Sequence, residues 1–167
     1  PEVCMYYSLL EETGIHDKED EDEYWDFYPV FEDSGLNSLW QVIEDFCLGA
    51  TETSQSFDVL YQGLALPPYG VKQGAIPVIL AAVLLHHADD LGLYQDGTFI
   101  PRLGTEHFEL LIKYPERFAV KYFAVEGLRA EVFKELEAIL RNPQLKKLSK
   151  VRNATLLTVV TPLYQFV

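Results

Sequence analysis

The strongest hydrophobic pattern of the chain lies within residues 67–101. Helix breakers open it at Pro67-Pro68, and the apolar run 75–85 follows with no polar face. A helix that is apolar all round must be buried. Two short alternating segments then flank Asp96-Gly97, a pair that tolerates positive φ. The pattern therefore predicts a buried helix followed by a β-hairpin.

Shorter helices and a further strand are predicted around this region from apolar spacing, N-cap residue types and helix breakers. The buried helix itself should place Pro77 in its first turn, where a missing N–H costs little. The expected elements are, in order, a helix from Asn37 or Ser38 to Gly49, a helix from Ser56 as N-cap to about Ala65, the buried helix from Lys72 or Gln73 to His87, the hairpin over 91–94 and 98–100, a helix from Thr105 as N-cap to Pro115, a strand over 118–123 that pairs with the hairpin, a helix over 128–140, and a last helix or strand from Ala154.

This order predicts an α+β, helix-rich fold. A buried helix followed by a hairpin is how a winged-helix unit ends, so we expect a winged-helix-like core of three helices plus a β-hairpin, with additional C-terminal helices. Residues 1–35 should form an acidic, partly flexible N-terminal segment that contains aromatic residues. Residues 36–126 should form the winged-helix-like domain, and residues 127–167 a C-terminal helical extension with a basic linker.

Charge divides the chain into two unequal halves. Residues 1–70 hold sixteen acidic residues and one basic residue, whereas residues 71–167 hold ten acidic and twelve basic residues. The acidic excess is greatest over 17–23, where like charges repel and disfavour compaction. The basic excess is greatest between Arg141 and Arg152, which contains no acid. A net charge of −13 should repel phosphate backbones unless the basic stretch acts alone.

The ends of the chain and its cysteines indicate a cytoplasmic domain taken from a longer protein. Cys4 and Cys47 form no spaced pair and are expected to be reduced thiols. The start of the chain has no charged segment followed by an apolar one, so we expect no secretory signal, and the apolar run 75–85 is far shorter than the roughly 20 residues that span a bilayer. The first residue is not methionine, and the apolar pattern over 156–166 continues to the last residue. The alternative is a last helix that docks on its own core.

Residues of the types that bind metals occur close together at one place only, His86-His87-Ala88-Asp89-Asp90. His86 with Asp89 or Asp90 has ligand spacing on one helix face, and His107 or Glu109 could complete a site. We favour a structural role instead, with histidines near the negative end of a buried helix and aspartates in the following turn. No phosphate-binding loop, paired-cysteine motif or nucleophile elbow is present, so we expect no cofactor, no metal and no enzymatic activity.

The predicted burial of this helix also makes sequence-specific DNA binding unfavourable. In a DNA-binding winged helix, the helix before the wing enters the major groove and presents polar side chains to base edges. Here that helix offers only Lys72 and Gln73 at its start, and the wing tip carries Asp96. The basic stretch 141–152 leaves a contact with the DNA backbone open.

Several runs of the chain resemble a segment of large bacterial multidomain P-loop ATPases associated with anti-phage defence and restriction. They are Pro67-Pro-Tyr-Gly-Val-x-x-Gly-x-Ile-Pro-x-x-Leu-Ala-Ala, Leu93-Tyr-x-Asp-Gly-Thr-Phe-Ile-Pro, Tyr114-Pro-Glu-Arg-Phe118 and Val159-Val-x-Pro-Leu-Tyr-x-Phe-Val167. The resemblance covers about residues 36–167 and rests mainly on glycines, prolines and apolar residues. It implies a helical, winged-helix-like region that follows the ATPase domain and carries no known catalytic residue.

These observations lead to one functional hypothesis and one alternative. The first is a non-catalytic, winged-helix-like interaction module of a larger defence-type ATPase, which contacts other domains of its parent or a partner protein. The alternative is a DNA-binding winged-helix domain that uses the wing and the basic linker 141–152. No membrane partner is expected. The residues expected to make contacts are Trp25, Phe27, Tyr28, Tyr94, Phe99, Lys146, Lys147, Lys150 and Arg152.

Overall fold

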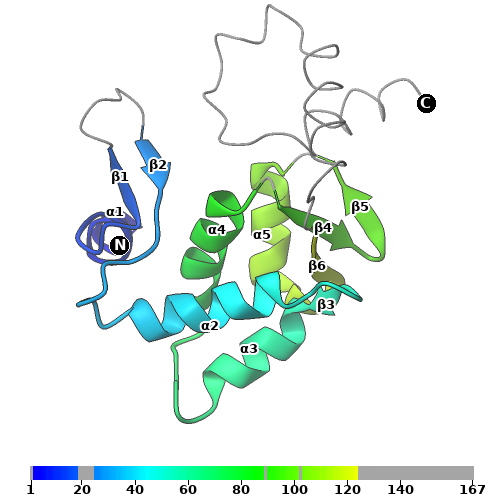
Figure 1. The fold of residues 1–167 in the computed structure, drawn as a ribbon, viewed down its shortest axis with the longest axis horizontal. Helices are drawn as coiled ribbons and strands as arrows, with labels where there is room; N and C mark the ends of the chain where they lie inside the picture. Colours follow the sequence, from blue (N-terminus) through cyan, green and yellow to red (C-terminus); the bar gives the residue numbers. More distant parts are fainter. Residues whose placement is uncertain (1, 19–24, 89, 102, 124–167) are drawn as a thin grey trace, which may run out of the picture.

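A computed structural model describes residues 2–18, 25–88, 90–101 and 103–123, and within them the fold is α+β, as predicted. Figure 1 shows the helices to the left of and below a four-stranded sheet. The elements are α1 (Glu2–Tyr6), a π-helical turn η1 (Tyr7–Glu11), β1 (His16–Lys18), β2 (Trp25–Phe27), α2 (Asn37–Leu48), β3 (Gln55–Ser56), α3 (Phe57–Ala65), α4 (Ile76–His86), β4 (Leu91–Gln95), β5 (Thr98–Ile100), α5 (Thr105–Lys113), a 3₁₀ turn η2 (Pro115–Arg117) and β6 (Phe118–Tyr122).

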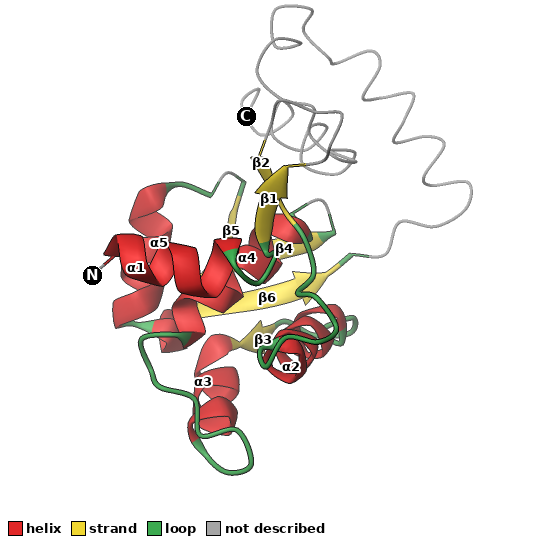
Figure 2. Cartoon of the chain, turned by 90° about the vertical axis from the view of Figure 1, so that its left-hand side faces the viewer, coloured by secondary structure: helices red, strands yellow, loops and turns green. Residues whose placement is uncertain are grey.

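The larger sheet is antiparallel and has the strand order β3-β6-β4-β5. The predicted hairpin is confirmed, since Leu93 lies opposite Ile100 across β4 and β5. The strand expected over 118–123 is confirmed as its partner, because β6 pairs with β4 along all five residues, with Leu93 opposite Val120. Figure 2 shows β6 running between β4 and the short strand β3. β5 and α5 are inserted in the sequence between these two central strands.

The core is built around α4, which is apolar on nearly all faces. Ile79, Leu80 and Val83 have no exposed surface, and Trp40 and Ile43 of α2 are equally buried. The predicted start of α4 was wrong by three or four residues, because residues 73–75 form a turn closed by the Ala75 amide and the Lys72 carbonyl. Pro77 has no N–H to donate to the carbonyl of Gln73, so an earlier start would lack that hydrogen bond.

Helix starts follow the sequence signal at Ser56 but not elsewhere, and for α2 the N-cap is Leu36 and not Asn37 or Ser38. The Ser56 hydroxyl accepts a hydrogen bond from the Asp58 amide at 3.3 Å and so caps α3 as predicted. For α5 the prediction was wrong by one residue, because Gly104 is the N-cap and Thr105 is the first helical residue. His107 Nδ1 accepts a hydrogen bond from the Gly104 amide at 3.0 Å. This N–H lies at the start of the helix and has no acceptor within the helix backbone.

Most of the N-terminal segment has regular structure in the described residues. Residues 7–18 and 25–31 fold back on the core, where Ile15 is fully buried and Val30 is 6% exposed. The Tyr28 amide donates to the Ile15 carbonyl at 2.8 Å, and β2 packs against α4. The helix expected over 128–140, the element expected from Ala154 and the basic linker all lie outside the described residues.

Candidate interaction surface

An apolar groove lies between α4 and α5. Its volume is about 200 Å³, and every side chain that lines it is apolar. Ile112, on the outer side of α5, is 57% exposed, and Tyr114 just beyond that helix is 46% exposed. This hollow, with the exposed side chain of Ile112 in its lining, is the candidate contact surface among the described residues. The lining residues are Pro77, Val78, Ala81, Phe108, Leu111 and Ile112.

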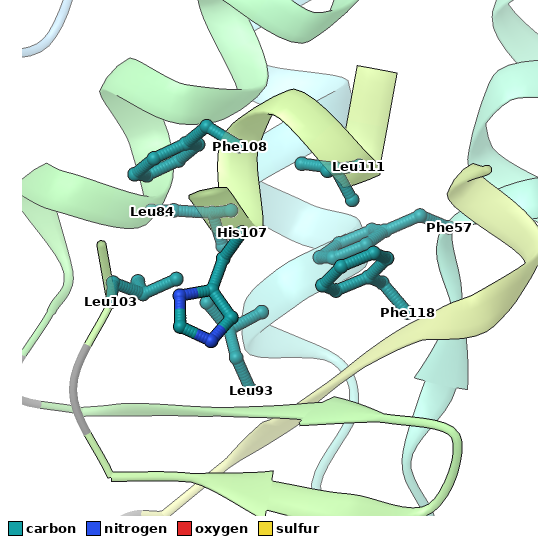
Figure 3. Close-up of a pocket in the computed structure, with 8 residues that line it drawn as sticks. All are labelled: Phe57, Leu84, Leu93, Leu103, His107, Phe108, Leu111 and Phe118. Carbon is teal, nitrogen blue, oxygen red and sulfur yellow. The ribbon is translucent and has the colours of Figure 1, made fainter. Parts of the chain in front are cut away.

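A second, smaller hollow borders this groove, and Figure 3 shows the side chains that line it. Its volume is only about 10 Å³, which is no more than one water molecule requires. Phe108 and Leu111 line both hollows. The side chains around the smaller hollow are Phe57, Leu84, Leu93, Leu103, His107, Phe108, Leu111 and Phe118.

The surface of α4 contains no polar side chain before its last residue. Seven of its eleven residues are buried, and those that reach solvent before His86 are Val78, Ala81 and Leu85. None of these can donate or accept a hydrogen bond at a base edge. The physical argument drawn from the sequence, that this helix belongs to the core, agrees with its burial.

The turn between β4 and β5 carries a closed ion pair. Asp96 and Gly97 have φ of 51° and 79°, the positive values for which an Asp-Gly pair is suited. Arg117 Nε donates to Asp96 Oδ1 at 3.0 Å, and Nη2 lies 2.5 Å from Oδ2. The hydrogen bonds from Arg117 lower the pKa of the Asp96 carboxyl and hold it ionised. Arg117, the one arginine among the described residues, is thus already paired with an acid at the turn between β4 and β5.

The predicted contact residues fall into two separate groups. Trp25 is 46% exposed and stacks on His16 with ring centroids 5.2 Å apart, and Phe27 lies against the same imidazole. Tyr94 and Phe99 face each other across the hairpin with centroids 5.6 Å apart. Figure 1 shows β2 and β5 on opposite sides of α4 and α5, so the structure does not bring the groups together.

Other predicted contact residues contribute less or lie outside the description. Tyr28 is partly buried beside Phe27 at the end of β2. Lys146, Lys147, Lys150 and Arg152 lie outside the described residues. The groove residues Val78 and Ile112 were missed. The sequence contains a signal for them. Val78 and Ile112 each lie in a helix rich in apolar residues, and not every apolar residue of two such helices can face the same core.

The two histidines at the end of α4 meet a carboxylate from α2. His87 Nε2 lies 2.6 Å from Glu44 Oε1, and His86 Nδ1 lies 2.7 Å from the Phe27 carbonyl oxygen. Asp90, a ligand candidate from the sequence, is exposed, and Asp89 lies outside the described residues. Glu44 was missed because it is forty-three positions before His87 and no local pattern connects them.

No protein-family model, curated protein or solved structure matches this chain. Among the helices that the structure describes, none has both the length and the apolar character needed to cross a bilayer.

Proposed function

We propose that this chain is a non-catalytic, winged-helix-like interaction module of a larger bacterial defence-type ATPase, and that it acts in the cytoplasm through contacts with neighbouring domains or a partner protein. The observation that carries the proposal is the groove between α4 and α5. It is apolar throughout, and Ile112 at its edge is more than half exposed. Covering such a surface removes apolar area from water, which is the main driving force of association.

The order of the elements supports the winged-helix part of the proposal. A winged helix consists of a helix, a strand, two helices and two strands, with the last strand between the other two. The sequence α2, β3, α3, α4, β4, β6 has this order, and the sheet order β3-β6-β4 has this arrangement. The proposed unit differs by the insertion of β5 and α5, and α5 supplies one wall of the groove.

The charge of the described residues favours a protein partner over DNA. They include sixteen acidic and five basic side chains. The helix that a DNA-binding winged helix would insert into the major groove is buried here. The alternative, a DNA-binding domain, would rest on the wing and on the basic linker 141–152, whose charges lie outside the described residues.

A non-catalytic role fits the state of two buried side chains that could otherwise act as nucleophiles. Burial raises the pKa of the Cys47 thiol to about 12, so it stays protonated and unreactive near neutral pH. Burial also raises the pKa of the Tyr61 hydroxyl to about 12. Neither group is placed to act as a base or nucleophile at neutral pH.

Site-specific photo-crosslinking in the larger protein tests the groove as a contact surface. Benzoylphenylalanine at position 112 should yield one crosslink to a defined peptide of a neighbouring domain or subunit, identified by mass spectrometry. The matched control is position 59 in α3, because Val59 is 63% exposed but does not line the groove. No crosslink from position 112, or equal diffuse crosslinking from both positions, would contradict the proposal.

A further inference from the structure

We propose that Glu44, His86 and His87 form a binding site for a zinc-like divalent metal ion. One ligand atom from each of the three side chains lies within 4.8 Å of those of the other two. Ligand atoms around a tetrahedral zinc ion, with bonds of about 2.0–2.1 Å, are about 3.3 Å apart. Small side-chain rotations therefore suffice to bring all three onto one ion. This site does not depend on the proposed function, because it lies on other residues than the groove.

The end of α4 explains how two consecutive histidines can converge. Side chains at successive helical positions normally point in different directions. His87 is instead the C-cap of α4, with φ of −102° and ψ of 26°, and has left the helical path. Its ring centroid lies 4.6 Å from that of His86, with the ring planes at 78°. Glu44 reaches the pair from α2, so two packed helices fix the geometry.

The contact made by His86 is one that supports metal binding. A carbonyl oxygen only accepts hydrogen bonds, so the 2.7 Å contact with Phe27 requires His86 Nδ1 to be the donor. The other ring nitrogen, Nε2, is then the atom that would bind the ion in the proposed site. A hydrogen bond from the second ring nitrogen to a backbone carbonyl orients metal-bound histidines in many sites. The ring is held further by the edge of Trp40, with centroids 5.9 Å apart.

The donor set and its burial define the class of ion. Two imidazole nitrogens and one carboxylate oxygen suit zinc and similar transition metals, whereas calcium and magnesium prefer oxygen alone. The side chains of His87 and Glu44 are 17% and 18% exposed, which leaves a path for an ion while limiting hydration. In the bound state the ion takes the place of the proton shared by His87 and Glu44. Three protein ligands leave one tetrahedral position for water or another ligand.

Titration of the tag-free, chelator-treated 167-residue chain with Zn²⁺ tests the site by calorimetry. We expect saturation at about one equivalent, and Co²⁺ should give the visible absorption bands of a tetrahedral complex. Glu44→Gln retains a hydrogen-bond acceptor for His87 but loses the charge, and it should weaken Zn²⁺ binding about 100-fold or more, as His87→Gln should. His107→Gln is the matched control, because this partly buried histidine also lies beside a carboxylate, that of Glu106, and should leave binding unchanged.

X-ray absorption of the wild-type Zn²⁺ complex keeps the test independent of whether the variants fold. We expect multiple scattering from two imidazole rings and a first shell of nitrogen and oxygen atoms at about 2.0–2.2 Å, with no sulfur. The proposal is overturned by the absence of binding in the wild type, by equal binding in Glu44→Gln and His107→Gln, or by a Zn–S distance that places the ion at the exposed Cys4.

Discussion

At the scale of single residues, the pair Asp96–Arg117 holds two opposite charges together at the exposed turn between β4 and β5. Arg117 holds the pKa of the Asp96 carboxyl below its ordinary value through hydrogen bonds and charge. The carboxylate therefore stabilises the folded state fully above the ordinary carboxyl pKa of about 3.9, and this contribution is lost as pH falls through the lower folded-state value. The pair is exposed, so its effect should diminish with salt.

Substitution of Asp96 by asparagine tests this linkage. Asparagine also tolerates the positive φ at this position, so the backbone of the turn is matched. Urea unfolding at several pH values should show wild type to be more stable than Asp96→Asn at pH 7. The difference should disappear as the pH falls below about 4. A stability difference that does not change with pH would show that the ion pair is not its source.

Residue types predicted some of these roles and not others. Ser56 as a cap and Asp96-Gly97 as a turn follow from local chemistry, which acts over a few positions and can be read from sequence. Glu44 beside His87 depends on how α2 crosses α4, which is set by packing and not by spacing. The hydrogen bond from the Gly104 amide to His107 was not predicted, because Glu or Gln, and not histidine, is expected three residues after the N-cap.

At the scale of elements, the burial of α4 is the observation on which the proposal of a module that does not read DNA depends. Leu80 in the middle of α4 has no exposed surface. Leu80→Ala should lower the free energy of unfolding by about 2–5 kcal/mol, through lost burial and a cavity. The measurement is urea unfolding followed by circular dichroism.

The matched control for that substitution is Val59→Ala in α3. Val59 is 63% exposed, so its truncation should change the free energy of unfolding by no more than about 0.5 kcal/mol. A comparably small loss for Leu80→Ala would mean that this face of α4 is not packed in solution, and the helix would then be available to bind elsewhere.

The elements with a strong local signal could be predicted from sequence with few errors, whereas α1, β1, β2 and β3 were not predicted. The apolar run of α4, the cap at Ser56 and the alternation in β4 and β5 all agree with the tertiary structure, as consistent local and global preferences should. The start of α4 was missed because the prediction began the helix at Lys72 or Gln73, although Pro77 lacks the N–H that a helix beginning there would need. β6 lies between β3 and β4, and both pairings join residues far apart in the sequence. Only the pairing of β6 with the hairpin was predicted.

At the scale of the whole molecule, the described residues form an acidic body with an apolar groove on one side and a histidine–glutamate cluster at the end of α4. Neither feature resembles a surface for nucleic acid, which requires basic side chains that track the phosphates. The groove is the feature on which the proposed interaction rests, and the cluster is the proposed metal site. They lie on different residues, so each can be removed by mutation without altering the other.

The central claim is that this module contacts protein and does not read DNA, and fluorescence anisotropy with a mixed-sequence DNA duplex tests it most directly. Titration of the 167-residue chain at low and at moderate salt should show no binding, even at low salt, where electrostatic attraction is strongest. Micromolar or tighter binding that weakens steeply with salt, and that is lost in a Lys146→Glu/Lys147→Glu/Lys150→Glu variant, would contradict the account and identify the basic linker as the DNA contact.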